Sequence, residues 1–65
     1  MNPDLDAILG LLENAKNTLT LMRDDNAKTA ERENDVSYLG YWRGRESAFE
    51  TARLLVDNII DVLQR

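Results

Sequence analysis

The chain has 65 residues with a net charge of −4, from 8 basic and 12 acidic side chains, and it has no cysteine and no histidine. This composition excludes disulfides, thiolate metal sites and the side chain that most often acts as a general base or transition-metal ligand. The acidic balance argues against extensive phosphate binding. A single domain of this size, without such staples, usually needs well-packed helices or a partner subunit. We therefore expect self-association.

No apolar run approaches the ~20 residues that a membrane-spanning helix needs. The first residues are acidic, which is unlike a signal peptide. These features predict a cytoplasmic protein that does not engage a membrane.

The first predicted helix begins at Asn2-Pro3-Asp4, where Asn2 can cap free amides and Pro3 fits the first helical position. Apolar residues then recur at three- and four-residue steps: Leu5, Ile8, Leu12, Ala15, Leu19 and Met22. This spacing predicts an amphipathic helix over about residues 3–32. Gly10 costs up to about 1 kcal/mol relative to alanine, so it predicts a close contact.

The segment Asp24–Asp35 contains no large apolar residue, and it leaves two positions for a turn. One lies near residues 24–28 and the other near residues 33–36. The later position is favoured because it gives two arms of similar length, each ~45 Å. It also sets Ala27 and Ala30 opposite the aromatic residues that follow. Three residues are suitable N-caps for the next helix: Asn34, Asp35 and Ser37.

The second predicted helix spans about residues 37–64 and carries an apolar face ~160° wide. Its members are Tyr41, Ala48, Phe49, Ala52, Leu55, Val56, Ile59, Ile60, Val62 and Leu63. A face this wide indicates two neighbouring helices. We therefore predict an all-α fold: residues 1–65 form one two-helix antiparallel hairpin, which pairs as a homodimer into a four-helix bundle. The expected dimer core is Leu55, Val56, Ile59, Ile60, Val62 and Leu63.

The stretch Tyr38–Ala52 combines small residues at four-residue steps with all four of the chain's aromatic side chains. The small residues are Gly40, Gly44, Ala48 and Ala52. Such a strip most often serves close internal packing, and the functional alternative is a groove for a helix of another protein. The predicted partner-binding residues are Tyr38, Gly40, Tyr41, Trp42, Arg43, Gly44, Arg45 and Ala48.

Four carboxylates of the second helix share a sector ~60° wide: Glu46, Glu50, Asp57 and Asp61. Carboxylates on facing helices can hold Mg²⁺ or Mn²⁺. The pattern resembles the acidic helices of all-α nucleotide pyrophosphohydrolases of the MazG type, which implies metal-dependent nucleotide hydrolysis. Against this, Arg53 lies inside the stripe, and Arg43 and Arg65 are spaced to pair with its members. This spacing favours a solvated, ion-paired helix face.

Arg43 and Arg45 lie beside Tyr41 and Trp42, and arginine with aromatic residues is a combination that binds nucleic acid. In length and expected architecture the chain resembles small two-helix RNA-binding dimers of the Rop kind, which implies an RNA-binding dimer. The remaining basic residues of the first helix are sparse, and the net charge is negative. Nucleic-acid binding is therefore the less favoured interpretation.

No nucleophile in the sequence has an activating histidine, and no glycine-rich phosphate loop is present. We expect a non-enzymatic protein without metal or cofactor that acts by protein–protein interaction, as an adaptor, inhibitor or regulator. Small acidic chains of this length are common among phage and plasmid proteins that bind a host factor. The expected partners are a second copy of the chain and another protein.

Overall fold

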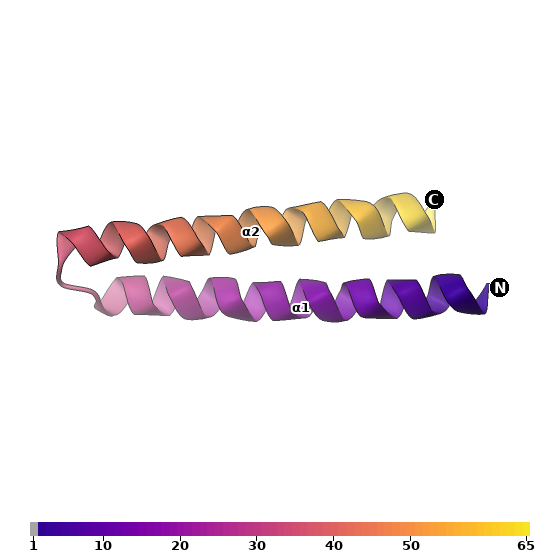
Figure 1. Ribbon diagram of the computed structural model, residues 1–65, viewed down its shortest axis with the longest axis horizontal. Helices are drawn as coiled ribbons and strands as arrows, with labels where there is room; N and C mark the ends of the chain where they lie inside the picture. The colour runs from indigo at the N-terminus through magenta and orange to yellow at the C-terminus, as the bar shows by residue number, and fades with distance from the viewer. Residues whose placement is uncertain (1) are drawn as a thin grey trace.

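In the computed structural model, which describes residues 2–65, the chain is a hairpin of two antiparallel helices (Figure 1). Helix α1 spans Pro3–Arg32 and helix α2 spans Val36–Gln64. The helices run side by side, with both ends of the chain at one end of the hairpin and the turn at the other. The all-helical hairpin expected from the apolar periodicity is confirmed.

Both helices begin at side-chain caps. The Asn2 Oδ1 accepts hydrogen bonds from the backbone amides of Asp4 at 2.9 Å and Leu5 at 3.4 Å. The Asp35 Oδ1 accepts one from the Ser37 amide at 2.9 Å. These bonds satisfy amides that have no partner inside the helix. The turn between the helices occupies residues 33–35, the later of the two positions considered.

The hairpin is long and thin. Its Cα atoms extend over 52 × 15 × 11 Å, with a radius of gyration of 15.2 Å. A compact domain of this length has a radius of gyration of about 11 Å. The chain exposes 4851 Å² of surface, whereas a compact monomer of its mass exposes about 4,200 Å². A single copy thus leaves more surface in water than a typical folded domain of its size.

The two helices meet along one stripe of each, which we call the inner seam. Its positions alternate three- and four-residue steps, the spacing of a coiled-coil heptad. In α1 they are Leu5, Leu9, Leu12, Lys16, Leu19, Arg23, Asn26 and Ala30, and Glu33 continues the spacing into the turn. In α2 they are Leu39, Trp42, Glu46, Phe49, Arg53, Val56, Ile60 and Leu63. Each of these residues is buried or half-buried.

The core within this seam is small. Ala30 and Ile60 are its buried apolar residues, at 2% and 4% exposure, and Asn26 is a buried polar one at 5%. The middle of the seam is polar because Lys16 and Arg23 occupy heptad positions there. Since burial of apolar area is the main favourable term in folding, a lone hairpin with this seam has little to stabilise it.

The register of the helices follows from contacts between them. Lys16 reaches Asp57, Arg23 reaches Glu50, and Asn26 accepts from Arg45. This alignment places Ala30 opposite Trp42, a small residue against a large one. No helix among residues 2–65 is long and apolar enough to cross a membrane.

Candidate functional site

Each helix carries a second heptad-spaced row beside the inner seam, which we call its outer row. The outer row of α1 is Ile8, Leu11, Ala15, Thr18, Met22, Asp25, Thr29 and Arg32. The outer row of α2 is Tyr38, Tyr41, Arg45, Ala48, Ala52, Leu55, Ile59 and Val62. Each helix therefore presents two adjacent stripes, and the inner seam uses one of them.

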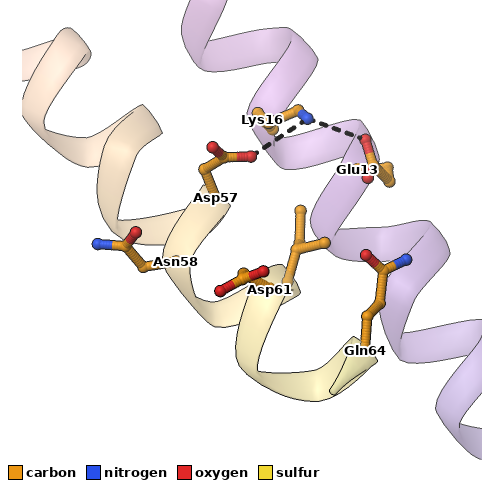
Figure 2. A pocket seen from close by; sticks show the side chains of 7 residues that line it. Glu13, Lys16, Asp57, Asn58, Asp61 and Gln64 are labelled. Carbon is orange, nitrogen blue, oxygen red and sulfur yellow. Dashed lines mark hydrogen bonds and ion pairs between the residues drawn. The ribbon is translucent and has the colours of Figure 1, made fainter.

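Both outer rows lie on one broad side of the hairpin. In an antiparallel helix pair, the heptad positions that flank the seam in one helix lie on the same side of the pair as the equivalent positions in the other helix. The opposite flank is polar, because Glu13 and Lys16 of α1 share a shallow pocket with Asp57 and Gln64 of α2 (Figure 2). The outer rows flank the other side of the seam, and we call that side the apolar face.

Large side chains of the apolar face are left in water. Leu11 is 70% exposed and Leu55 and Val62 are each 60% exposed, while Ile8 and Ile59, nearer the seam, are each 48% exposed. Contiguous apolar surface on a soluble protein usually marks a contact surface. This face is the strongest candidate for a functional site.

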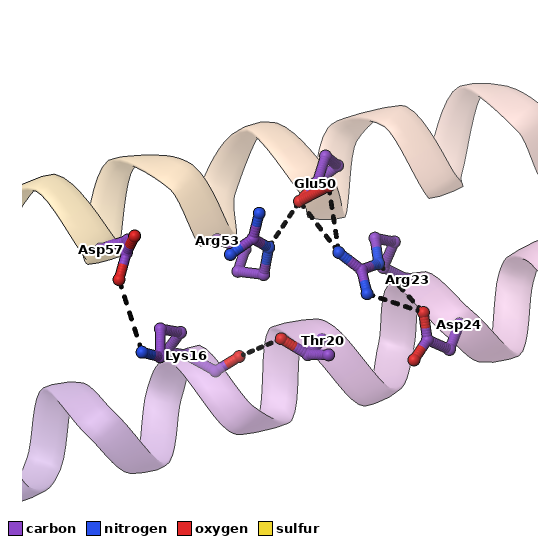
Figure 3. Close-up of polar contacts among 7 residues, drawn as sticks. All are labelled: Lys16, Thr20, Arg23, Asp24, Glu50, Arg53 and Asp57. Carbon is purple, nitrogen blue, oxygen red and sulfur yellow. Dashed lines mark hydrogen bonds and ion pairs between the residues drawn. The ribbon is translucent and has the colours of Figure 1, made fainter.

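The polar side of the hairpin is covered by ion pairs between the helices (Figure 3). The Lys16 ammonium lies 3.4 Å from carboxylate oxygens of both Asp57 and Glu13. The Arg23 guanidinium donates to both carboxylate oxygens of Glu50, at 3.1 and 3.0 Å. These pairs are partly solvated, so they align the helices more than they stabilise them.

The same contacts shift the pKa values of Glu50 and Lys16. The Arg53 guanidinium, and after it Arg23, lowers the pKa of the Glu50 carboxyl, against an opposing effect of desolvation. The Asp57 carboxylate, and after it Glu13, raises the pKa of the Lys16 ammonium. Both groups are thereby held in their charged forms.

The acidic stripe is an ion-paired surface. Glu46 pairs with Arg43 at 2.7 Å, Asp61 pairs with Arg65 at 2.7 Å, and Glu50 pairs with Arg53. The sequence spacing predicted these three pairs, which lie within one helix. Its fourth member, Asp57, pairs with Lys16 from the other helix at 3.4 Å. Within the described residues, no group of three or more carboxylates is placed to hold a metal ion.

Arg45 lies on the apolar face near the turn, where its guanidinium contacts Asn26 and two aromatic rings. Its Nε donates to the Asn26 Oδ1 at 3.0 Å. Its guanidinium lies 5.7 Å from the Tyr41 ring centroid and 5.6 Å from that of Phe49. Asn26 in turn donates to the Met22 carbonyl at 2.7 Å. This arrangement fixes Arg45 at the edge of the seam, where its side chain remains exposed.

The predicted partner-binding residues do not form one surface. Tyr38, Tyr41, Arg45 and Ala48 belong to the outer row of α2. Trp42 lies in the inner seam and meets the Tyr41 ring edge-on at 4.9 Å. The remaining members lie away from the apolar face and are exposed: Gly40, Arg43 and Gly44. A groove of about 450 Å³ at the turn end is lined by Ser37, Tyr38, Tyr41 and Trp42.

The expectation that the glycines serve close packing is wrong within the hairpin. A Cβ added at Gly40 or Gly44 would meet nothing within 4 Å, and the same holds for Gly10. The physical reason is that all three positions fall outside the inner seam. No contact between α1 and α2 depends on the absence of a side chain at these three glycines.

The predicted dimer core divides between the two stripes of α2. Val56, Ile60 and Leu63 lie in the inner seam and pack against α1. The other three residues, Leu55, Ile59 and Val62, are exposed in the outer row. They line an open apolar groove of about 460 Å³ together with Asn58 and Leu63. Only half of the wide apolar arc predicted for this part of α2 therefore packs against α1.

Comparisons with protein-family models, with curated proteins and with solved structures give no significant match to this chain.

Proposed function

We propose that the chain is a non-enzymatic interaction module that works as a homodimer, with two hairpins packed through their apolar faces into a four-helix bundle. The observation that carries this proposal is the exposed apolar face, whose outer rows continue along both helices. Apolar residues at heptad spacing in a second stripe are the pattern of helices that have two neighbours, and here they gather near the open end at Ile8, Leu11, Leu55, Ile59 and Val62. The hairpin supplies one neighbour for each helix, and a second copy supplies the other.

The dimensions of the hairpin fit this assembly. Its broad side measures 52 by 15 Å between Cα extremes, and the product of these lengths is about 780 Å². Stable protein interfaces bury about 800 Å² on each partner. Face-to-face pairing would therefore cover an area on each copy close to that of a stable interface.

The size of the inner core supports the same conclusion. Small domains rarely obtain more than about 3–5 kcal/mol from a single core, and the seam of this hairpin contains Lys16, Arg23 and Arg53 beside its apolar residues. A second apolar layer would add the burial that the seam lacks.

We assign binding of another protein to the turn end of the bundle, within Tyr38–Ala52, so that the dimer acts as an adaptor, inhibitor or regulator. Tyr38 and Tyr41 are 60% and 54% exposed in the single hairpin, and they end the outer row at the turn, so in the dimer they would lie at the rim of the interface. The uncovered backbone at Gly40 and Gly44 lies on the outer side of the same segment. Exposed aromatic residues with nearby arginine are typical of interface hot spots.

The contacts of the charged residues favour this proposal over the two chemical alternatives. The carboxylates considered for metal-dependent hydrolysis each have a basic partner, as described above. Arg43 pairs with Glu46, and Arg45 binds Asn26. The groups on which hydrolysis or RNA binding would depend are therefore engaged within the hairpin.

Measurement of the dissociation constant by analytical ultracentrifugation tests the proposal. We expect Leu55→Ala, on the apolar face, to weaken the dimer strongly and Leu54→Ala, on the opposite side of α2, to leave it intact. A chain that is a folded monomer at micromolar concentration would refute the proposed assembly.

A further inference from the structure

We infer that the second copy packs with its turn at the same end as the first, so that α1 of each copy lies against α2 of the other. This inference rests on the proposed dimer and specifies its geometry. Two hairpins stacked face to face can be related by a two-fold axis along the helices or by one across them. The first arrangement places both turns together, and the second places them at opposite ends.

Side-chain size is matched when the turns lie together. The outer rows then pair position by position, in nearly the same register as the inner seam. At the open end, Ile8 meets Val62 of the second copy. In the middle, Ala15 meets Leu55 of the second copy, and Met22 meets Ala48 of the second copy. A large side chain faces a small one at both middle positions, which allows close and even packing.

Charge is matched in the same arrangement. Asp25 and Arg45 are charged residues in the half of the outer rows nearer the turn, and the Asp25–Arg45 contact occurs twice across the interface of the dimer. Asp25 forms no ion pair within residues 2–65 of its own chain, while Arg45 has a neutral partner in Asn26. The dimer would give both charges an opposite partner.

The alternative arrangement fails the same comparison. With the turns at opposite ends and the helices in full overlap, each outer row faces its own copy in reverse. Arg45 then faces Leu55 of the second copy, and Asp25 faces Ala15 of the second copy. Burying a charge without a partner is costly. The pairing of charges therefore favours the turns lying together.

Distances between labels at the two ends test the orientation directly. The chain has no cysteine, so Asn34→Cys in the turn and Gln64→Cys at the open end each give one spin-label site. With the turns together, both variants should give distances of a few helix spacings, roughly 20–30 Å. With the turns apart, the Asn34→Cys distance should approach or exceed the 52 Å length of the hairpin.

These outcomes separate the inference from the proposal on which it rests. A long turn-to-turn distance in a dimer would overturn the orientation and leave the dimer standing. Absence of any distance, with a 7.4 kDa species in solution, would overturn the dimer itself.

Mixing two charge variants tests the Asp25–Arg45 contact. Asp25→Arg and Arg45→Asp each place like charges together in their own homodimers, which should weaken on the order of ten-fold. An equimolar mixture should form a heterodimer of nearly the original affinity, because both cross-chain pairs are restored. Mixing cannot repair damage inside one chain, so a mixture no tighter than its components would overturn the contact. Asp24→Arg, which removes a carboxylate that pairs with Arg23, is the matched control and should show no preference for Arg45→Asp.

Discussion

Replacement of Leu55 by alanine should weaken the dimer by a predictable amount. The residue is 60% exposed in the hairpin, and complete burial of a leucine side chain contributes about 1.5–3 kcal/mol. Covering the exposed part would contribute about 1–2 kcal/mol per copy. Because the dimer contains the residue twice, Leu55→Ala should cost about 2–4 kcal/mol, a rise in the dissociation constant of roughly 30- to 700-fold.

The neighbouring Leu54 provides the control for this measurement. It is 47% exposed on the other side of the same helix. Leu54→Ala therefore makes the same chemical change one residue away along the helix, outside the proposed interface. Sedimentation equilibrium over a concentration series would give both dissociation constants, and circular dichroism would show that each variant remains helical. Equal effects of the two substitutions would refute the assignment of the interface to the apolar face.

Three further predictions concern the hairpin. Ile60→Ala, at a buried position of the inner seam, should lower the free energy of unfolding by about 2–4 kcal/mol in chemical denaturation; a negligible loss would contradict the packing of Ile60 against α1. Gly44→Ala should raise the free energy of unfolding by up to about 1 kcal/mol, since alanine favours the helix and the added Cβ meets nothing; a loss of stability would show that another chain contacts this position. The lowered pKa of Glu50 contributes stability that is present above its ordinary value of 4.5 and is lost as the pH falls through its value in the folded state. The raised pKa of Lys16 contributes stability that is complete below 10.5 and is lost as the pH rises through its folded value. Glu50→Gln should therefore lower the thermal stability near neutral pH and make its fall on acidification shallower, and an unchanged acid limb in that variant would contradict the role of the ion pair.

The sequence carried enough information to predict the hairpin and the residues that form its helices. Apolar periodicity marks an amphipathic helix whatever it packs against, and the N-caps are local signals. Ion pairs within one helix, such as Arg43–Glu46, were also predictable because their geometry depends only on spacing.

Features that depend on how two helices align were not predictable. The pairs Lys16–Asp57 and Arg23–Glu50 require the interhelical register, which spacing along a single helix does not contain. The burial of Asn26 has the same origin, since its hydrogen bond to Arg45 exists only across the seam. Division of the wide apolar face into inner and outer stripes also needed the structure. Periodicity gives the width of that face and leaves open which half meets α1.

The mass of the unmodified chain in solution is the most direct test of the central claim. Sedimentation equilibrium at micromolar concentration should give about 15 kDa, twice the 7.4 kDa of a single chain, together with a helical circular dichroism spectrum. A helical species of 7.4 kDa that persists as the concentration rises would contradict self-association through the apolar face.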